Sequence, residues 1–467
     1  MANQALLKQI PSVDTVLDDL DDEKYNLPRE FVLQTVRTVL GDLRTEILDG
    51  KEYPQNDLES IALNRIKDFC KIRSAGSMQS VVNATGIVLH TGLGRAPLST
   101  SARDALSRSA EGYCNLEFDL ESGQRGQRND HIEDLLCALT GADAGLMVNN
   151  NAAAVMLSLN TLAEGGEAII SRGQLVEIGG SFRIPDVMAK SGAVMVEVGT
   201  TNRTHLRDYE NAITDDAAMI LIAHTSNYKI EGFTATPDLR DILSLAHAND
   251  LPVMYDLGSG ALFEMEQYGL PHEHIVSEIV EADVDVVTFS GDKLIGGPQA
   301  GLIVGKKQYV DRIKRNPMTR ALRCDKLIYS AMEATLQTYT NPEQLPKRNT
   351  TYTLLTQSMD TLEELGEAVL SELDGEVIET LGIKLTDAET EAGSGSLPTE
   401  KIPGKALVIT SAQWSAQKMM RWMRRYETPV VGYISEDKCF FNLRAVMREQ
   451  IAILVNAFTA LAEAMDE

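Results

Sequence analysis

The most informative stretch of the chain is Val-Asp-Val-Val-Thr-Phe-Ser-Gly-Asp-Lys-Leu-Ile-Gly-Gly-Pro-Gln-Ala-Gly, residues 284–301. The apolar run 284–289 predicts a buried strand, and the glycines after Lys293 predict a tight turn. The ε-amine is therefore displayed at a strand end. A Schiff-base lysine needs such a position, because it must reach a cofactor aldehyde and later swing free as a base. Alone, the short motif favours an ordinary surface-loop lysine.

An aspartate ends another predicted strand, 251–256, so that Asp256 and Lys293 can lie at neighbouring strand tips. A buried carboxylate at this place would keep the ring nitrogen of pyridoxal phosphate protonated, which the ring needs in order to stabilise a carbanion. Asp292, beside the lysine, completes the catalytic candidates. The alternative role for Asp256 is to cap the glycine-bearing turn 258–260.

A phosphate site is predicted where Asn150, Asn151 and Ala152 open an alanine-rich helix after a short apolar run. The first N–H groups of a helix and its dipole favour an anion. Ser290 is a candidate for a further hydrogen bond to the phosphate, and Asn227 for one to the phenolic oxygen of the ring. An asparagine N-cap without any ligand is the alternative reading of this motif.

The three elements follow the chain order phosphate cap, ring-nitrogen partner and lysine, which is the order of aminotransferase-like, fold type I pyridoxal-phosphate enzymes. Short apolar strands alternate with helices from residue 168 onward, as a mainly parallel sheet covered on both faces requires. We therefore expect an α/β fold with a mainly parallel, seven-stranded-type sheet, which would bind its ligand at the carboxyl ends of the strands.

Changes of texture along the chain predict three domains. Residues 1–75 read as a helical module, with helices over 29–49 and 58–72; residues 76–342 read as the catalytic core, and residues 343–467 as a small α+β domain. Within this last part, residues 387–399 are expected to form a loose connection between regular elements.

Composition excludes several classes of protein. The chain has 467 residues, 43% of them hydrophobic and 24% charged, as is typical of globular proteins. Its five cysteines form no C-x-x-C pair, so that we expect neither a metal site nor a disulfide framework. The start carries no apolar run and no stretch is long enough to cross a bilayer, so we expect a cytoplasmic protein without a membrane partner. The formal net charge of -25 repels DNA and other polyanions at long range.

Five longer motifs resemble the bacterial selenocysteine synthase family, the L-seryl-tRNA(Sec) selenium transferases. They are residues 82–98 (VNATGIVLHTGLGRAPL), 149–154 (NNNAAA), 171–180 (SRGQLVEIGG), 224–228 (HTSNY) and 290–301 (SGDKLIGGPQAG). The resemblance spans essentially the whole chain. It implies that the chain uses pyridoxal phosphate to remove water from serine esterified to tRNA(Sec), and that selenium from selenophosphate then takes the place of the hydroxyl, giving selenocysteinyl-tRNA(Sec).

The donor in this reaction is a small polyanion, for which planar guanidinium groups are well suited. Arg95, Arg320 and Arg323 match that role, the last two spaced by three as on one helix face. Their alternative is a solvated basic face, or ion pairs with Asp292 or Asp325.

Further arginines have weaker assignments. Arg125 and Arg128 are candidates for contacts with tRNA or with a neighbouring subunit's site. Arg444 resembles an arginine that binds the substrate carboxylate in many relatives, although here that carboxyl would be esterified.

The family's N-terminal module is thought to hold the tRNA, yet residues 1–75 carry 10 Lys and Arg against 14 Asp and Glu. A cluster at its end, Arg65, Lys67, Lys71 and Arg73, is the candidate phosphate-binding patch. A solvated helix face is its alternative. We therefore expect recognition of RNA shape with few phosphate contacts. Gly92 departs from the family, whose members often have asparagine there.

The resemblance also implies a homo-oligomer of closed symmetry, a ring built from dimers and by kinship a homodecamer. Two other readings stay open. One is a related β-eliminating lyase acting on a free amino-sugar phosphate or hydroxyamino acid, which would not need the helical module. The other is an RNA-binding protein without activity, against which the intact Lys293 motif speaks.

Overall fold

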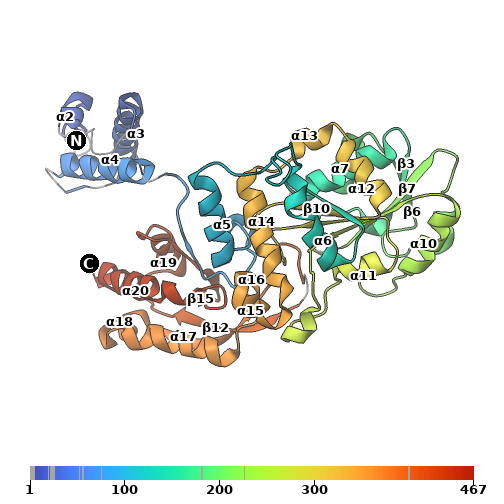
Figure 1. The fold of residues 1–467 in the computed structure, drawn as a ribbon. Helices are drawn as coiled ribbons and strands as arrows, with labels where there is room; N and C mark the ends of the chain where they lie inside the picture. The colour runs from blue at the N-terminus through green and yellow to red at the C-terminus, as the bar shows by residue number, and fades with distance from the viewer. Residues whose placement is uncertain are drawn as a thin grey trace. The chain divides into compact units, whose positions relative to one another are not determined.

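The computed structural model describes residues 6–18, 20, 27–51, 53–54, 57–74, 76–179, 182–225, 227–397 and 400–466 (Figure 1). The chain forms two compact units, which divide between Ser80 and Val81. Among the described residues, no helix has the length and apolar character that crossing a bilayer requires.

The first unit is helical, as expected. It contains α2 (Val13–Asp18), α3 (Arg29–Leu48) and α4 (Leu58–Ser74). Helix α3 buries one stripe of side chains that includes Val32, Val36 and Leu43, at the spacing of an amphipathic helix. The predicted helices 29–49 and 58–72 correspond to α3 and α4, whereas the short helix α2 was not predicted.

The second unit is built on a seven-stranded sheet in the order β2-β10-β9-β8-β7-β3-β6. The strands are β2 (Ala144–Val148), β3 (Glu167–Ser171), β6 (Val194–Val198), β7 (Ala217–Ala223), β8 (Val253–Gly258), β9 (Val286–Ser290) and β10 (Gly301–Gly305). All neighbours run parallel except that β10 is antiparallel to both β2 and β9. The expected mainly parallel sheet is confirmed.

Helices cover both faces of this sheet, which explains why its central strands are apolar throughout (Figure 1). One face packs on α7 (Asn151–Ala163), α8 (Ile184–Ser191) and α12 (Lys307–Arg315). The other face packs on α6 (Glu133–Thr140), α9 (Leu206–Glu210), α10 (Leu239–Ala248), α11 (Val276–Glu281) and α14 (Lys326–Gln337). Helix α5 (Thr100–Glu111) lies against α14.

The antiparallel strand β10 was not foreseen, and it shapes the region around Lys293. Residue Gly301 of β10 pairs with Ser290 on one side and with Val148 on the other. A side chain at Gly301 would have no room, because its Cβ would lie 2.1 Å from the Asn150 carbonyl oxygen. This glycine therefore lets the start of β10 approach the start of α7.

A four-stranded antiparallel sheet, β11-β12-β15-β14, forms the core of the C-terminal region. Its strands are β11 (Lys384–Thr390), β12 (Ile402–Ile409), β14 (Tyr433–Ser435) and β15 (Lys438–Asn442). One face is covered by α17 (Met359–Glu372), α18 (Gly375–Leu381), α19 (Ala416–Met423) and α20 (Ile451–Asp466). The prediction of a loose stretch over residues 387–399 was wrong at its start, because residues 387–390 belong to β11. Residues 398 and 399 lie outside the described part of the chain.

Two short strand pairs and some short helices complete the unit. Strand β1 (Val82–Asn83) pairs with β13 (Val430–Val431), and β4 (Glu177–Ile178) pairs with β5 (Phe182–Arg183). The connecting helices are α13 (Met318–Leu322), α15 (Leu345–Arg348) and α16 (Thr350–Leu355). Because β1 packs in the C-terminal core, that region includes chain from both ends of the unit. The boundary expected at residues 342/343 stays a prediction.

Candidate active site

Lys293 lies on the turn between β9 and β10 and is only 5% exposed. The turn is held by backbone hydrogen bonds from Gly296 to the Lys293 carbonyl, at 2.9 Å, and from Leu294 to the Ser259 carbonyl, at 3.2 Å. Burial lowers the pKa of the Lys293 amine, and the nearby Asp256 opposes this effect. The environment thus favours the neutral amine, which is the nucleophilic and basic form.

Asp256 lies on the adjacent strand β8, paired in register with Thr288 of β9. Its carboxylate accepts hydrogen bonds from Asn151 Nδ2 at 2.8 Å and from Thr288 Oγ1 at 3.1 Å. Burial raises the pKa of Asp256, while these two donors act against that rise. A carboxyl group fixed in this way is suited to a cationic ring nitrogen, whose positive charge would compensate its burial.

The N-terminus of α7 meets the same edge of the sheet. Asn150 is its N-cap, with a side chain that accepts a hydrogen bond from Ala153 N at 2.8 Å. The first N–H groups of such a helix, here including those of Asn151 and Ala152, have no partner inside it, which is the arrangement that the predicted phosphate site requires. Ser290, buried at the end of β9, pairs with Gly301 of β10, and Gly301 in turn lies against Asn150 at the start of α7.

Buried polar atoms without a hydrogen-bond partner mark the same region. Among the described residues they include Asn151 Oδ1, Ser259 Oγ and Arg95 Nε. Such atoms are costly in a folded protein unless a ligand or water satisfies them. Together with the lysine, the aspartate and the helix N-terminus, they fit pyridoxal phosphate, which has an aldehyde, a ring nitrogen and a phosphate.

Arg95 and Asp292 form an ion pair beside Lys293, with 2.7 Å between Nη1 and Oδ2. Arg95 has a left-handed backbone (φ 63°), an uncommon conformation for a residue with a side chain. The ion pair with Asp292, which the sequence analysis kept as an alternative role for the arginines, is therefore present for Arg95. It places Arg95, one of the three candidate arginines for the selenium donor, beside Lys293.

The other two arginines lie elsewhere in the chain. Arg320 is on α13, and Arg323 follows it with its Nη1 3.4 Å from Glu117 Oε1. Both line a cavity of about 330 Å³ together with Arg125 and Arg128. In the described part of the chain no hydrogen bond or ion pair joins this cavity to Arg95.

Two further candidates are engaged in other contacts. Asn227 Nδ2 donates to the Glu177 carbonyl oxygen at 2.8 Å, so its expected role at the ring stays a prediction. Arg444 is 2% exposed and donates to the backbone carbonyls of four residues, which are Leu354, Leu355, Gln357 and Pro403. These bonds give Arg444 a structural role in joining the C-terminal region to α16.

The basic cluster of the N-terminal unit is only partly free. Arg65 pairs with Glu46 at 3.1 Å, and Arg73 lies over the rings of Phe31 and Phe69. Lys67 and Lys71 are exposed on the same helix, α4. The candidate tRNA contacts therefore share one helix but differ in how accessible their charges are.

Three site residues were missed by the sequence interpretation. Thr288 donates a hydrogen bond to Asp256, and the Ser259 carbonyl accepts one from Leu294 N in the lysine turn. His224 directly follows β7 and contributes to lowering the pKa of Asp256. Thr288 stands in a predicted strand, His224 directly follows one, and Ser259 lies in the turn 258–260 after another, which was the available signal. Their relevance depends on strand register, which the sequence pattern did not provide.

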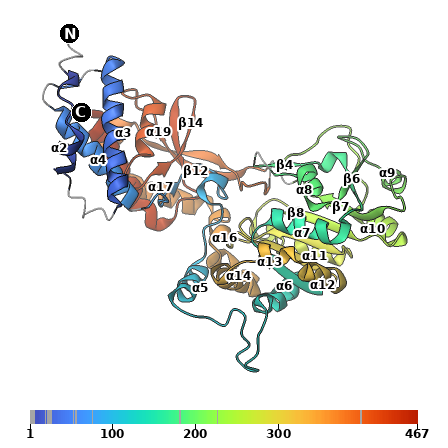
Figure 2. The same ribbon diagram turned by 90° about the horizontal axis from the view of Figure 1, so that it is seen from above.

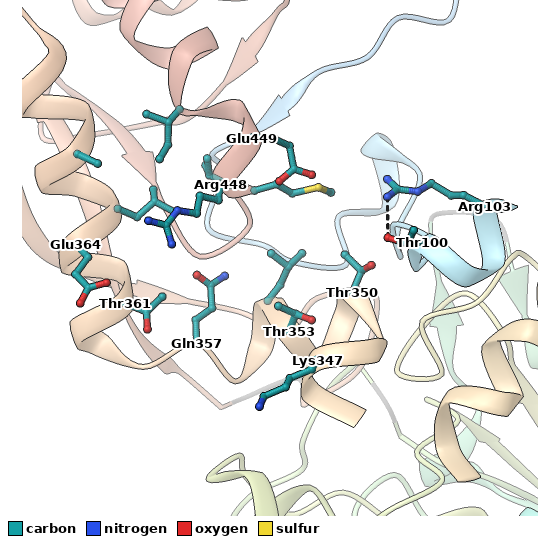
Figure 3. Close-up of a pocket in the computed structure, with 16 residues that line it drawn as sticks. Thr100, Arg103, Lys347, Thr350, Thr353, Gln357, Thr361, Glu364, Arg448 and Glu449 are labelled. Atoms are coloured by element: carbon teal, nitrogen blue, oxygen red, sulfur yellow. Dashed lines mark hydrogen bonds between the residues drawn. The ribbon is translucent and has the colours of Figure 1, made fainter. Parts of the chain in front are cut away.

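A second cavity, of about 390 Å³, lies between α5, α15–α16, α17 and the segment before α20 (Figure 3). Its labelled polar residues include Arg103, Gln357 and Arg448. It contains none of the residues predicted for cofactor or substrate. The catalytic region is therefore assigned from the chemistry around Lys293.

Comparison with solved structures supports the fold. A structure of D-glucosaminate-6-phosphate ammonia-lyase superimposes with a TM-score of 0.61, covering 85% of this chain and 99% of that chain at 18% identity. At this identity the likeness establishes the architecture alone.

Sequence comparison is more specific. Residues 81–447 match the family model described as L-seryl-tRNA selenium transferase, and residues 7–44 match the model described as selenocysteine synthase N terminal. Proteins named L-seryl-tRNA(Sec) selenium transferase are 42% identical in Alkaliphilus metalliredigens, 43% in Geobacter sulfurreducens and 44% in Geotalea uraniireducens, each over 98% of this chain and 99% of the relative. The chain therefore belongs to the L-seryl-tRNA(Sec) selenium transferase family and is a pyridoxal-phosphate-dependent enzyme.

Proposed function

We propose that this chain converts seryl-tRNA(Sec) to selenocysteinyl-tRNA(Sec), with selenophosphate as the selenium donor. The observation that carries the proposal is the buried Lys293 beside Asp256 and the α7 N-terminus, in a chain that matches transferases of that name over 98% of its length. The same match favours this reaction over a lyase acting on a free amino-sugar phosphate or hydroxyamino acid.

The residues of the site divide the chemistry among them. When bound, pyridoxal phosphate supplies an electron sink for negative charge at the α-carbon of the seryl group. Asp256 holds a proton at the ring nitrogen, and the N–H groups of Asn151 and Ala152, with Ser290, bind the phosphate. Lys293, whose amine pKa is lowered by burial, takes the α-proton of the substrate and returns it later.

The exchange at the β-carbon balances without an oxidant or reductant. The seryl C–O bond breaks and the hydroxyl leaves as water with a proton from the site. The donor's Se–P bond then breaks, selenium forms the new bond to the β-carbon, and the phosphoryl group ends as phosphate with the oxygen of water. Arg95, Arg320 and Arg323 provide positive charge for the donor.

Arg95 lacks a contact with Arg320 and Arg323 in the described part of a single chain. This separation supports a site completed by a second copy, and we propose a closed homo-oligomer, by kinship a decameric ring, located in the cytoplasm. The tRNA is proposed to contact the N-terminal unit through Arg65, Lys67, Lys71 and Arg73, with most of the recognition directed at RNA shape.

The test incubates the cofactor-loaded protein with seryl-tRNA(Sec) and selenophosphate, and identifies the amino acid on the recovered tRNA. We expect selenocysteine, and no product with Lys293→Ala protein of the same fold. Recovery of unchanged serine from wild-type protein with proven bound cofactor would reject the proposal. Turnover of a free hydroxyamino acid or amino-sugar phosphate, without turnover of the charged tRNA, would favour the lyase.

A further inference from the structure

Four arginines gather around one cavity of the second unit. Arg125 and Arg128 come from the segment between α5 and α6, whereas Arg320 and Arg323 come from the region of α13. The cavity has a volume of about 330 Å³, enough for a small anion and its hydration water. In a chain with a net charge of -25, such a concentration of guanidinium groups favours an anionic ligand.

Three of these arginines are held by a single carboxylate, that of Glu117. Its Oε1 lies 2.6 Å from Arg128 Nε and 3.4 Å from Arg323 Nη1, and its Oε2 lies 2.9 Å from Arg125 Nη2. These arginines lower the pKa of Glu117, with the hydrogen bond from Arg128 as the largest cause. The carboxylate is therefore ionised and occupies the donors that an external oxyanion would use.

The cavity is close to the cofactor end of the sheet. Arg323 forms a backbone bridge with Val148, and Asn149 N donates to the Leu322 carbonyl at 2.9 Å. Val148 is separated from Ser290 by the single strand β10, a distance of about 10 Å at the usual strand spacing. An anion bound here would lie near the α7 N-terminus without occupying the site of the cofactor phosphate.

We propose that Glu117 is an internal counter-ion of this arginine cavity, and that a tetrahedral oxyanion binds by taking its place on Arg128 and Arg323. Arg320 has no ion-pair partner in the described part of the chain and is the first guanidinium available to the incoming anion. That the physiological oxyanion is the selenium donor rests on the proposed function, whereas the displacement itself does not.

The segment that carries Glu117 is anchored to the core beside it, at Leu116, and extends outward from there. It projects from the body of the unit between α5 and α6 (Figure 2). Tyr113 and Leu120 on this segment are exposed, and its turn is closed locally by a bridge between Phe118 and Arg125. Displacement of Glu117 breaks ion pairs between partly exposed side chains, 28% exposed for Glu117 and 20% for Arg128, which the incoming anion and water can replace.

The decisive experiment measures binding of inorganic phosphate to the cofactor-loaded full chain by calorimetry at low ionic strength. Glu117→Gln removes the competing charge, so we expect phosphate to bind about tenfold more tightly than to wild type. Glu117→Asp keeps the charge and should resemble wild type. Glu121→Gln, on the same segment but without an ion pair to any described residue, is the matched control. Unchanged or weaker binding to Glu117→Gln would overturn the proposal.

Two additions make the result specific. Adding Arg128→Gln to Glu117→Gln should remove the gain in affinity, and a gain that persists would place the phosphate elsewhere. In wild-type protein, saturating phosphate should speed hydrogen exchange of the backbone around residues 113–126, because the segment loses its anchor. Slower or unchanged exchange there would also contradict displacement, and it requires no variant.

Activity then separates this inference from the proposed function. Glu117→Gln should lower the KM for selenophosphate while kcat stays close to wild type, since binding and not chemistry changes. If wild-type protein makes no selenocysteinyl-tRNA yet Glu117→Gln binds phosphate more tightly, the proposed function fails and the counter-ion role stands. If selenocysteine is formed but phosphate affinity does not rise, only the counter-ion role fails.

Discussion

The guanidinium of Arg95 lies 2.7 Å from the carboxylate of Asp292, although 197 residues separate them in the chain. Asp292 directly precedes Lys293, so the loop that holds Arg95 and the turn that holds the lysine are tied together by charge. Asp292 is largely buried, and its side chain would be an uncompensated charge without this partner.

Removing both members of this pair should lower the free energy of unfolding by less than the sum of the two single losses. Asp292→Asn and Arg95→Gln are each expected to lower the free energy of unfolding, with a coupling energy of about 1.5–3 kcal/mol in a double-mutant cycle. Denaturant unfolding of the full chain measures it. A coupling close to zero would mean that the two side chains do not depend on each other.

Gly301→Ala should weaken cofactor binding. Its Cβ would lie 2.1 Å from Asn150 O and 2.9 Å from Asn151 N, so the start of α7 must shift and its N–H groups turn away from the phosphate. We expect at least a tenfold rise in the dissociation constant of pyridoxal phosphate, measured by equilibrium dialysis. Gly94→Ala, where a Cβ would meet open space, is a control for glycine replacement, although its positive φ adds some strain.

Arg444→Met should destabilise the fold while leaving the chemistry of any folded molecules nearly unchanged. The replacement leaves several backbone carbonyls without a donor, and we expect a loss of about 3 kcal/mol in unfolding free energy. Arg421→Met, at an exposed position of α19, should have little effect. A large rise in KM at full stability would instead indicate a substrate-binding arginine.

The N-terminal unit should contain an acid-sensitive link. Arg65 above all, with Lys51, lowers the pKa of Glu46 from 4.5 to about 2. Because the folded-state pKa is depressed, this contribution to stability is complete above pH 4.5 and is lost as the pH falls toward 2. Glu46→Gln should therefore weaken hydrogen-exchange protection of α4 at neutral pH.

The difference in α4 hydrogen-exchange protection between Glu46→Gln and wild type should shrink as the pH falls from 4.5 toward 2. Glu59→Gln, an exposed change on α4, the helix whose protection is measured, serves as its control. A difference that persists unchanged at the acidic end would assign the effect to packing and not to charge.

The sequence predicted the parts of the site that stand at strand ends. Lys293, Asp256 and Asn150 follow apolar runs or open a helix, and these local patterns are sufficient to place them at one edge of a parallel sheet. The family resemblance then supplied the cofactor and reaction, which the comparisons confirm.

What the sequence did not predict depends on contacts between distant segments. The direction of β10, the bond from Thr288 to Asp256 and the joining of β1 to β13 all follow from register and sheet order, which leave no periodic signal. Arg444 shows the same limit, because its motif resembled that of a substrate-binding arginine while its partners are backbone carbonyls. Glu117 gave no signal at all, since its three arginine partners come from two separate segments.

The place of β10 between β2 and β9 also has a consequence for how the protein acquires activity. The strands it joins are far apart in sequence, so this pairing forms only after a long loop has closed, an entropically slow step. Before β10 is inserted, the lysine turn and the phosphate-binding helix have no common scaffold. Affinity for vitamin B6 should consequently appear late in refolding, as a marker that the whole sheet has been completed.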